Sequence, residues 1–254
     1  MRSKPSMPSR VRLDDLLVAR GHFASRSRAR DAVARGTVVI GGAPALKPGQ
    51  TVATDADIAV NDPAADYVSR AALKLIAGLD HFGFAVPGNV ALDIGASTGG
   101  FTQVLLERGA RKVFAIDVGH GQMDAALRAD PRVVSIEGLN ARDLTPDNLS
   151  GEAPNLIVSD VSFISLKLAL PPALGLAAAG ARGVFLVKPQ FEAGREAIGK
   201  GGLLKNPEDA ERIAEDLRQW LDGQPGWRSL GIAPSPIVGG DGNREFLLGG
   251  AKDR

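Results

Sequence analysis

The sequence predicts an α/β protein in which a mainly parallel sheet, with helices on both faces, follows a small α+β domain. Beyond about residue 69, continuous apolar runs of strand length alternate with segments of helix length. Such runs are expected when helices cover both faces of a parallel sheet. The charge also divides along the chain. Residues 1–60 hold 10 Lys and Arg against 5 Asp and Glu, whereas residues 61–254 hold 20 against 24.

The N-terminal part predicts two short helices behind a flexible leader. Residues 1–10 are rich in Ser, Pro and basic side chains, which is typical of a flexible, basic leader. A first helix is expected from Arg12 to Gly21, because three leucines share one of its faces: Leu13, Leu16 and Leu17. Ser25 has the position of an N-cap for a second helix through Ala34, and Gly36 follows as its stop.

Short strands are expected to complete this domain over residues 11–60. Val38–Ile40 is apolar and β-branched, a Gly-Gly turn follows it, and a last strand is expected around Asp57–Val60. The polar, Pro-containing segment after it predicts a linker over residues 61–68. The remaining residues, 69–254, are expected to form the larger domain.

The larger domain is expected to contain five parallel strands and a late hairpin. The five candidate strands are Val90–Ile94, Lys112–Asp117, Val133–Glu137, Asn155–Asp160 and Gly183–Lys188. Two further β-like runs, Ser229–Ala233 and Arg244–Leu248, have no crossover helix between them. They predict an antiparallel hairpin at one edge of the sheet.

Composition excludes several classes of site. The chain has 254 residues, 44% of them hydrophobic, and no cysteine, so disulfides, thiolate nucleophiles and zinc–thiolate sites are ruled out. The basic N-terminus lacks the apolar core of a secretory signal. The longest weakly charged stretch, Leu168–Ala181, is too short to span a bilayer and is interrupted by prolines. A cytoplasmic protein that does not engage a membrane is therefore expected.

A glycine-rich loop after the first strand predicts a nucleotide-like ligand. In the segment DIGASTGGF, Asp93 ends the apolar run, Gly95 and Gly99 permit unusual backbone angles, and a helix follows. The spacing differs from the G-x-G-x-x-G of dinucleotide binders. An acid beside the loop would repel a pyrophosphate but suits the amino group of a methionine-derived methyl donor. Asp117, at the end of the next strand, is suited to accept hydrogen bonds from ribose hydroxyls.

The candidate contacts of the donor extend beyond this loop, and an alternative remains. The full candidate set is Asp93, Gly95, Ala96, Ser97, Gly99, Gly100, Phe101, Asp117, Asn140 and Asp160. Asn140 and Arg142 are candidates for the adenine end, although ordinary loop polarity explains them equally well. The alternative for the whole loop is a glycine turn without a ligand.

Two strand ends carry a charged pair. Asp160 and Lys188 close neighbouring apolar runs, and in a parallel sheet both would emerge at the edge that holds the glycine loop. A simple structural ion pair is one interpretation. The other is chemical: a lysine held in its neutral form by its surroundings can take the proton from a ribose 2′-hydroxyl. A sulfonium methyl is already activated, so no metal is required, and alignment of the reacting atoms is the main demand.

At this point the sequence resembles a known family. The segments YVSRAALKL, DIGASTGGF, SDVSF, VKPQFE and GNREFLL together resemble the TlyA family, within the FtsJ-like ribose methyltransferases. The resemblance extends from about Arg12 to Leu248. It implies a Rossmann-like domain that uses S-adenosyl-L-methionine, preceded by an RNA-binding domain of a type first seen in a ribosomal protein. Tyr67-Val68 stands where some relatives carry Trp-Val, and Ser97 where many methyltransferases carry glycine.

The resemblance also implies a catalytic tetrad and a substrate. The matching positions are Lys74, Asp160, Lys188 and Glu245. Lys188 would take the hydroxyl proton, Lys74 would favour the neutral form of Lys188, and the two acids would orient them. From pattern alone, Lys74 and Glu245 are indistinguishable from surface charges. The implied substrate is ribosomal RNA within ribosomal subunits, with cytidine as the modified nucleotide. The alternatives are a non-catalytic RNA- or ribosome-binding factor and a hemolysin-like membrane-active protein.

Basic residues of the small domain are candidates for RNA contact. The candidates are Arg12, Arg20, Arg26, Arg28, Arg30 and Arg35. On a small domain they can form one cationic face for phosphate groups. Phe23 is the only aromatic residue between positions 11 and 60, so recognition of backbone and shape is expected to outweigh base stacking. The alternative is a solvated Arg-rich surface without a partner.

Overall fold

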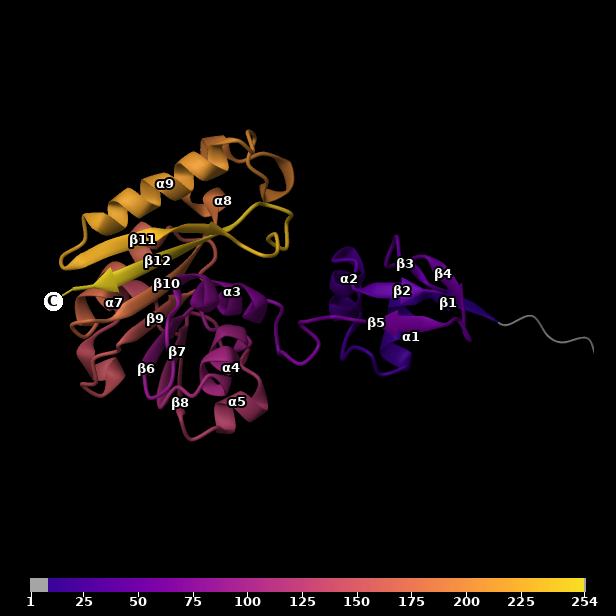
Figure 1. Cartoon of the computed structure of the whole chain (residues 1–254), viewed down its shortest axis with the longest axis horizontal. Coiled ribbons are helices and arrows are strands. Elements are labelled where there is room, and N and C mark those ends of the chain that lie inside the picture. Colours follow the sequence, from indigo (N-terminus) through magenta and orange to yellow (C-terminus); the bar gives the residue numbers. More distant parts are fainter. Residues whose placement is uncertain (1–8, 254) are drawn as a thin grey trace, which may run out of the picture. The chain divides into compact units, whose positions relative to one another are not determined.

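The computed structural model describes residues 9–253 (Figure 1). The chain divides between Asp66 and Tyr67 into a smaller N-terminal unit and a larger C-terminal unit. Residues 1–8, which make up most of the expected leader, lie outside the described part. Arg10, which the sequence places in the leader, instead begins the first strand.

From residue 9 onward, the smaller unit contains two helices and five short strands. Its elements are β1 (Arg10–Arg12), α1 (Leu13–Ala19), α2 (Arg26–Ala34), β2 (Val38–Ile40), β3 (Ala43–Pro44), β4 (Thr51–Ala53) and β5 (Ile58–Val60). Strand β1 pairs with β4, and β3, β2 and β5 form a three-stranded antiparallel sheet. Ser25 caps α2 by accepting a hydrogen bond from the Arg28 backbone N–H. Leu13 and Leu17 are fully buried, so the expected apolar face of α1 is confirmed.

The larger unit is built on one seven-stranded sheet. Its strands are β6 (Val90–Ile94), β7 (Lys112–Asp117), β8 (Val133–Glu137), β9 (Leu156–Ser159), β10 (Arg182–Val187), β11 (Trp227–Pro234) and β12 (Phe246–Lys252). The order across the sheet is β11-β12-β10-β9-β6-β7-β8. The five strands from β10 to β8 are parallel, and β12 pairs antiparallel with both β10 and β11. The expected edge hairpin is therefore confirmed.

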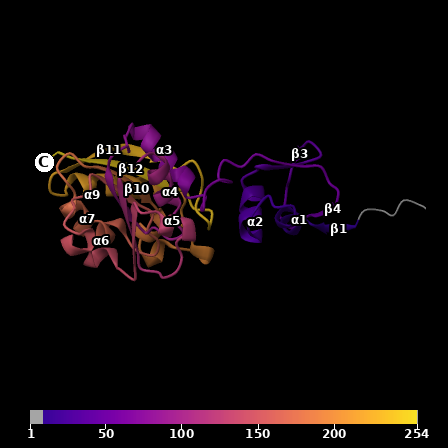
Figure 2. The same ribbon diagram turned by 90° about the horizontal axis from the view of Figure 1, so that it is seen from below.

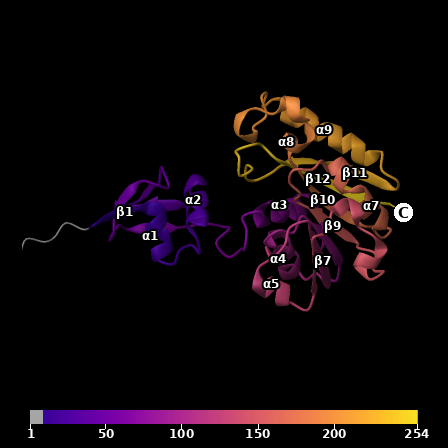
Figure 3. The same cartoon turned by 180° about the vertical axis from the view of Figure 1, so that it is seen from behind.

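Helices cover both faces of this sheet, as Figures 1, 2 and 3 show from three directions. The helices are α3 (Ala72–Phe82), α4 (Gly100–Glu107), α5 (Ala125–Ala129), α6 (Leu166–Ala169), α7 (Pro171–Leu176), α8 (Pro189–Glu192) and α9 (Asp209–Asp222). Short 3-10 turns occupy residues 141–143, 146–149, 195–197 and 200–202. One apolar layer joins α3 and α4 to the sheet, and the other joins α6, α7 and α9 to its opposite face.

The side chains of β10 show how the strand serves both layers. Val184 and Leu186 pack in the layer of α3 and α4, while Phe185 and Val187 pack in the layer of α9. All four are essentially inaccessible to solvent, which explains why the strand is a continuous apolar run. Strand β9 ends one residue before Asp160, and β10 ends one residue before Lys188. Both charged residues thus begin the loops at the carboxyl edge of the sheet.

The close approach of α3 to the sheet yields a stability prediction. A Cβ atom on Gly78 would lie 2.6 Å from Cγ1 of Val184, so we expect Gly78→Ala to lower the free energy of unfolding by about 1–3 kcal/mol through overpacking. Denaturant titration measures this change. Gly175→Ala in α7 is the control, because its Cβ would meet no atom within 4 Å, and we expect equal or greater stability. Equal stability of Gly78→Ala and the wild type would contradict the proposed packing.

Candidate active site

The glycine loop between β6 and α4 has a strained backbone held by the neighbouring strands. Gly95 and Gly99 have φ of +83° and +98°, and Ser97, at +48°, is one of the few non-glycine residues with positive φ. The backbone N–H groups of Gly95 and Ala96 both donate to the carbonyl of Ile116. A Cβ on Gly95 would come within 2.9 Å of the Asp160 carbonyl oxygen. The loop therefore lies directly against the end of β9, and glycine is required there for packing.

Asp117 ties this loop to the end of β7. One carboxylate oxygen accepts a hydrogen bond from the Ser97 N–H at 2.8 Å, and the other accepts from the Gly119 N–H at 2.7 Å. Ser97 also forms a side-chain hydrogen bond with Gln122, at 3.1 Å. Asp117 thus shapes the loop, and its oxygens retain lone pairs for a further donor.

A cleft of about 690 Å³ opens over the carboxyl edge of the sheet. Five of the predicted donor contacts line it: Gly95, Ser97, Asp117, Asn140 and Asp160. Apolar side chains from the ends of β6 and β7, including Ile94 and Ile116, form part of the wall. Arg142 also lines the cleft, and its backbone N–H and Nε both donate to the side chain of Asn140. Acidic oxygens beside an apolar wall suit a ligand that combines hydroxyl groups, an aromatic base and positive charge.

Asp93 lies beneath the loop, where it is completely buried. One oxygen accepts a hydrogen bond from the Thr102 hydroxyl at 2.7 Å, and the other has no donor within the described residues. Burial raises the pKa of the Asp93 carboxyl to about 7, with a smaller contribution from the nearby charge of Asp160. Asp93 is expected from the sequence to contact the methyl donor, but the structure leaves none of its surface exposed. Its visible role is to support the first turn of α4.

The remaining loop residues divide between a smaller pocket and the interior. Ala96, Gly100 and Phe101 line a pocket of about 150 Å³, together with Gly95, Asp160 and Lys188. Gly99 packs inward instead, since a Cβ there would lie 2.5 Å from Leu127. The loop and the charged strand ends therefore share one small pocket, as the sequence analysis expects from the parallel arrangement.

Lys188 and Asp160 form the first ion pair of the site. The Lys188 Nζ lies 2.6 Å from an Asp160 carboxylate oxygen. The same nitrogen donates a hydrogen bond to the Ser162 hydroxyl at 2.8 Å. The exposed fraction of Lys188 is only 9%, so this cation has lost most of its water and depends on these two partners.

Lys74 and Glu245 form a second ion pair, which sequence spacing alone did not reveal. Lys74 lies on α3 and Glu245 immediately precedes β12; their charged atoms are 2.5 Å apart, and each residue is 5% exposed. Glu245 and Lys188 line one cavity of about 410 Å³. Lys188, Asp160 and Glu245 thus line neighbouring cavities, Lys188 belongs to two of them, and Lys74 reaches this group through its pair with Glu245.

Two polar residues of the site were missed by the sequence analysis. Ser162 lines the cleft and both smaller cavities, and Gln190 lines the cavity that also holds Lys188 and Glu245. The one feature of the sequence that could have identified them is their closeness to predicted site residues: Ser162 is two residues beyond Asp160, and Gln190 is two beyond Lys188. Serine and glutamine are common in loops, so their types alone gave no reason to select them.

Most of the candidate RNA-binding arginines are engaged within the smaller unit. Arg12 and Arg26 both pair with the buried carboxylate of Asp14, and Arg20 donates to the carbonyls of Thr54 and Ala56. The Arg12 guanidinium holds the pKa of Asp14 at about 2. All three guanidinium groups therefore hold the domain together, and Asp14 offsets part of the charge of Arg12 and Arg26.

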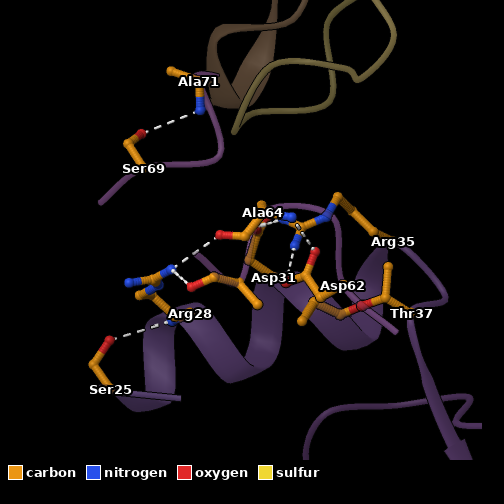
Figure 4. A network of polar contacts seen from close by, with 11 residues as sticks. Ser25, Arg28, Asp31, Arg35, Thr37, Asp62, Ala64, Ser69 and Ala71 are labelled. Atoms are coloured by element: carbon orange, nitrogen blue, oxygen red, sulfur yellow. Dashed lines mark hydrogen bonds and ion pairs between the residues drawn. The ribbon is translucent and has the colours of Figure 1, made fainter. Parts of the chain in front are cut away.

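Arginines of the second helix, α2, and of its C-terminal end also form contacts within the smaller unit, as Figure 4 shows in detail. Arg28 donates to the carbonyls of Ala64 and Ala65, and Arg35 pairs with Asp31 and Asp62. Residues of the expected linker are thus bonded to α2. Arg30 is exposed and makes no side-chain hydrogen bond or ion pair with the described residues. Among the six candidates, Arg30 is the one that is structurally uncommitted within residues 9–253.

The described residues contain no helix that is both long enough and apolar enough to cross a membrane.

Comparisons with known proteins agree with this geometry. The family model of the FtsJ-like methyltransferases matches residues 67–252, and that of the S4 domain matches residues 11–58. The chain is 46% identical to the 16S/23S rRNA (cytidine-2′-O)-methyltransferase TlyA of Mycobacterium tuberculosis, over 95% of this chain and 90% of that protein. It is 40% identical to Hemolysin A of Brachyspira hyodysenteriae, over 93% and 98% of the two chains.

A solved structure supports the same relationship. The chain superposes on a Streptococcus thermophilus protein named among the hemolysins with a TM-score of 0.74 and 40% identity, over 97% of this chain and 90% of the other. The expected Rossmann-like architecture and the preceding S4-type domain are confirmed. From the matched family models and the extent of identity along nearly its whole length, we conclude that this chain belongs to the TlyA family of FtsJ-like methyltransferases.

Proposed function

We propose that this protein transfers a methyl group from S-adenosyl-L-methionine to the ribose 2′-hydroxyl of a cytidine in ribosomal RNA. The observation that carries the proposal is the position of the Lys188–Asp160 ion pair beside the glycine loop, in a pocket that Gly95 also lines. The named activity of the Mycobacterium tuberculosis relative supports the choice of substrate. Ribosomal subunits as the form of the substrate are part of this proposal.

The cleft offers hydrogen-bonding and charged groups that suit such a cofactor. Asp117 and Asn140 are positioned to receive ribose hydroxyls and the adenine end, while Asp160 presents negative charge toward a cationic group. When bound, S-adenosyl-L-methionine supplies a methyl group already activated by the sulfonium. The residues of the chain therefore have to hold the acceptor oxygen in line with that methyl and to accept the hydroxyl proton.

Lys188 is the proposed proton acceptor. Lys188 lines both the pocket beside the glycine loop and the larger cavity that Glu245 lines. A 2′-hydroxyl placed there could donate to the neutral amine, and Asp160 would stabilise the ammonium that forms. The Lys74–Glu245 pair would hold Glu245 in place beside the cavity that Glu245 and Lys188 line, and so orient this side of the site.

A single substitution tests this assignment. We expect Lys188→Ala to lower kcat for methyl transfer at least a hundredfold, because the proton acceptor is removed, while the Kd for S-adenosyl-L-methionine changes only a few-fold. Transfer of labelled methyl to ribosomal subunits and calorimetry give the two values. Lys112→Ala is the control, because Lys112 begins β7 at the opposite edge of the sheet and pairs with Glu152. Retained activity in Lys188→Ala would remove Lys188 from the mechanism.

Asp93 provides a prediction about pH. Its folded-state pKa of about 7 lies above the ordinary value of 3.8, so between these values the folded state binds a proton that the unfolded state has lost. The stability contributed by Asp93 is therefore complete below pH 4 and lost as the pH rises through 7. We expect Asp93→Asn to gain stability relative to wild type over this range, by a few kcal/mol at most. A difference in free energy of unfolding that stays constant from pH 4 to pH 8 would contradict this.

The smaller unit is proposed to contact the RNA, and Arg30 gives the clearest test. We expect Arg30→Glu to weaken RNA binding about tenfold and to reduce the slope of log affinity against log salt by about one, since one phosphate contact is lost. Filter binding at several salt concentrations measures both. Arg212→Glu, an exposed charge reversal on α9, serves as the control. An unchanged salt slope in Arg30→Glu would exclude Arg30 from the RNA contact.

A further inference from the structure

Ser162 lines all three of the cavities described above. It lies in the loop after β9, two residues beyond Asp160, and its side chain is exposed. It lines the 690 Å³ cleft, the 410 Å³ cavity and the 150 Å³ pocket that connects with the glycine loop. A residue at this junction faces the proposed donor on one side and the proposed acceptor on the other.

The contact between Ser162 and Lys188 is specific. The Lys188 Nζ donates to Ser162 Oγ at 2.8 Å and lies 2.6 Å from an oxygen of Asp160. An amine nitrogen is tetrahedral, so the hydrogen bond to Ser162 fixes one of its three substituent directions beyond the carbon, and the Asp160 carboxylate lies close on a second side. The remaining side is open to the hydroxyl that is to lose its proton.

We propose that Ser162 is a positioning residue for methyl transfer, acting through Lys188. In the neutral amine, the N–H donated to Ser162 would fix the rotation of the amine beside the Asp160 carboxylate, so that the lone pair is directed at the acceptor hydroxyl. Without Ser162, the four-carbon side chain of Lys188 can rotate and its lone pair loses this direction. This inference rests on the proposed function of the site.

Methyl transfer forms one bond, breaks another and moves one proton to Lys188. As the acceptor oxygen forms its bond to the methyl carbon, the bond between that carbon and sulfur breaks, and sulfur leaves as a neutral thioether. The hydroxyl proton passes to the lone pair of Lys188 Nζ, which becomes an ammonium. Ser162 already accepts a hydrogen bond from this nitrogen, and the Asp160 carboxylate, 2.6 Å away, stabilises the new charge.

Ser162 has no comparable packing role. Its side chain is exposed, so it contributes little to the apolar core, and the neighbouring strained residue is Phe163, with φ of +64°. Replacing Ser162 with alanine removes one hydroxyl without placing a larger side chain in any of the three cavities. The substitution therefore isolates the contact with Lys188.

The test compares two serine-to-alanine variants. We expect Ser162→Ala to lower kcat for methyl transfer between tenfold and a hundredfold, with the KM for RNA and the Kd for S-adenosyl-L-methionine within about twofold of wild type. Ser162→Thr, which keeps the hydroxyl, should restore most of kcat. Ser159→Ala is the matched control: Ser159 lies three residues earlier, fully buried in β9, and its hydroxyl has no partner among the described residues.

The possible outcomes separate a failure of the Ser162 proposal from a failure of the proposed function. If wild type transfers methyl and Ser162→Ala matches its kcat, the positioning role is refuted while the proposed function stands. A loss that appears in donor Kd instead of kcat would assign Ser162 to the cofactor cleft and also refute the proposal. Failure of Ser162→Thr to recover activity would show that the hydroxyl is not what matters. Absence of methyl transfer by wild type would overturn the proposed function, and this inference with it.

Discussion

The structure of the larger unit depends on one constraint: a lysine at the end of a buried strand needs a carboxylate within reach. Strand β10 is enclosed on both faces and ends one residue before Lys188. Its parallel neighbour β9 ends one residue before Asp160, so the register of the two strands delivers the partner. Strand β6 lies beyond β9, and its end begins the glycine loop. The Lys188–Asp160 pair, the glycine loop and the pocket that they line therefore all result from the order of the parallel strands.

The antiparallel hairpin of β11 and β12 brings a further charged residue to the same edge of the sheet. Because β12 runs opposite to β10, its first residue pairs with the last residue of β10, Phe246 with Val187. Glu245 therefore arrives at the carboxyl edge from the other direction, where Lys74 of α3 meets it. Burial of ion pairs contributes little net stability, because desolvation offsets their attraction. Folding stability alone therefore does not account for the two pairs, whereas the proposed proton transfer gives both of them a purpose.

The sequence predicted the parts of this structure that depend on local pattern. The limits of β6, β7 and β8 agree with the expected ranges because buried parallel strands are unbroken apolar runs. Strands β1, β3 and β4 were not located individually, since two or three residues are too few to show periodicity. Lys74 and Glu245 are 171 positions apart, and only tertiary structure unites them. Similarly, the arginine pattern predicted positive charge but not the internal acids and carbonyls that engage most of it.

In the proposed reaction, a base at the carboxyl edge of the sheet assists methylation of a ribose oxygen. The most direct measurement incubates the protein with each ribosomal subunit and labelled S-adenosyl-L-methionine, then maps the product nucleotide by mass spectrometry. We expect label on the 2′-oxygen of cytidine and no transfer to a subunit whose target nucleotide is 2′-deoxy. Label on a nucleobase, or undiminished transfer to the deoxy substrate, would contradict it.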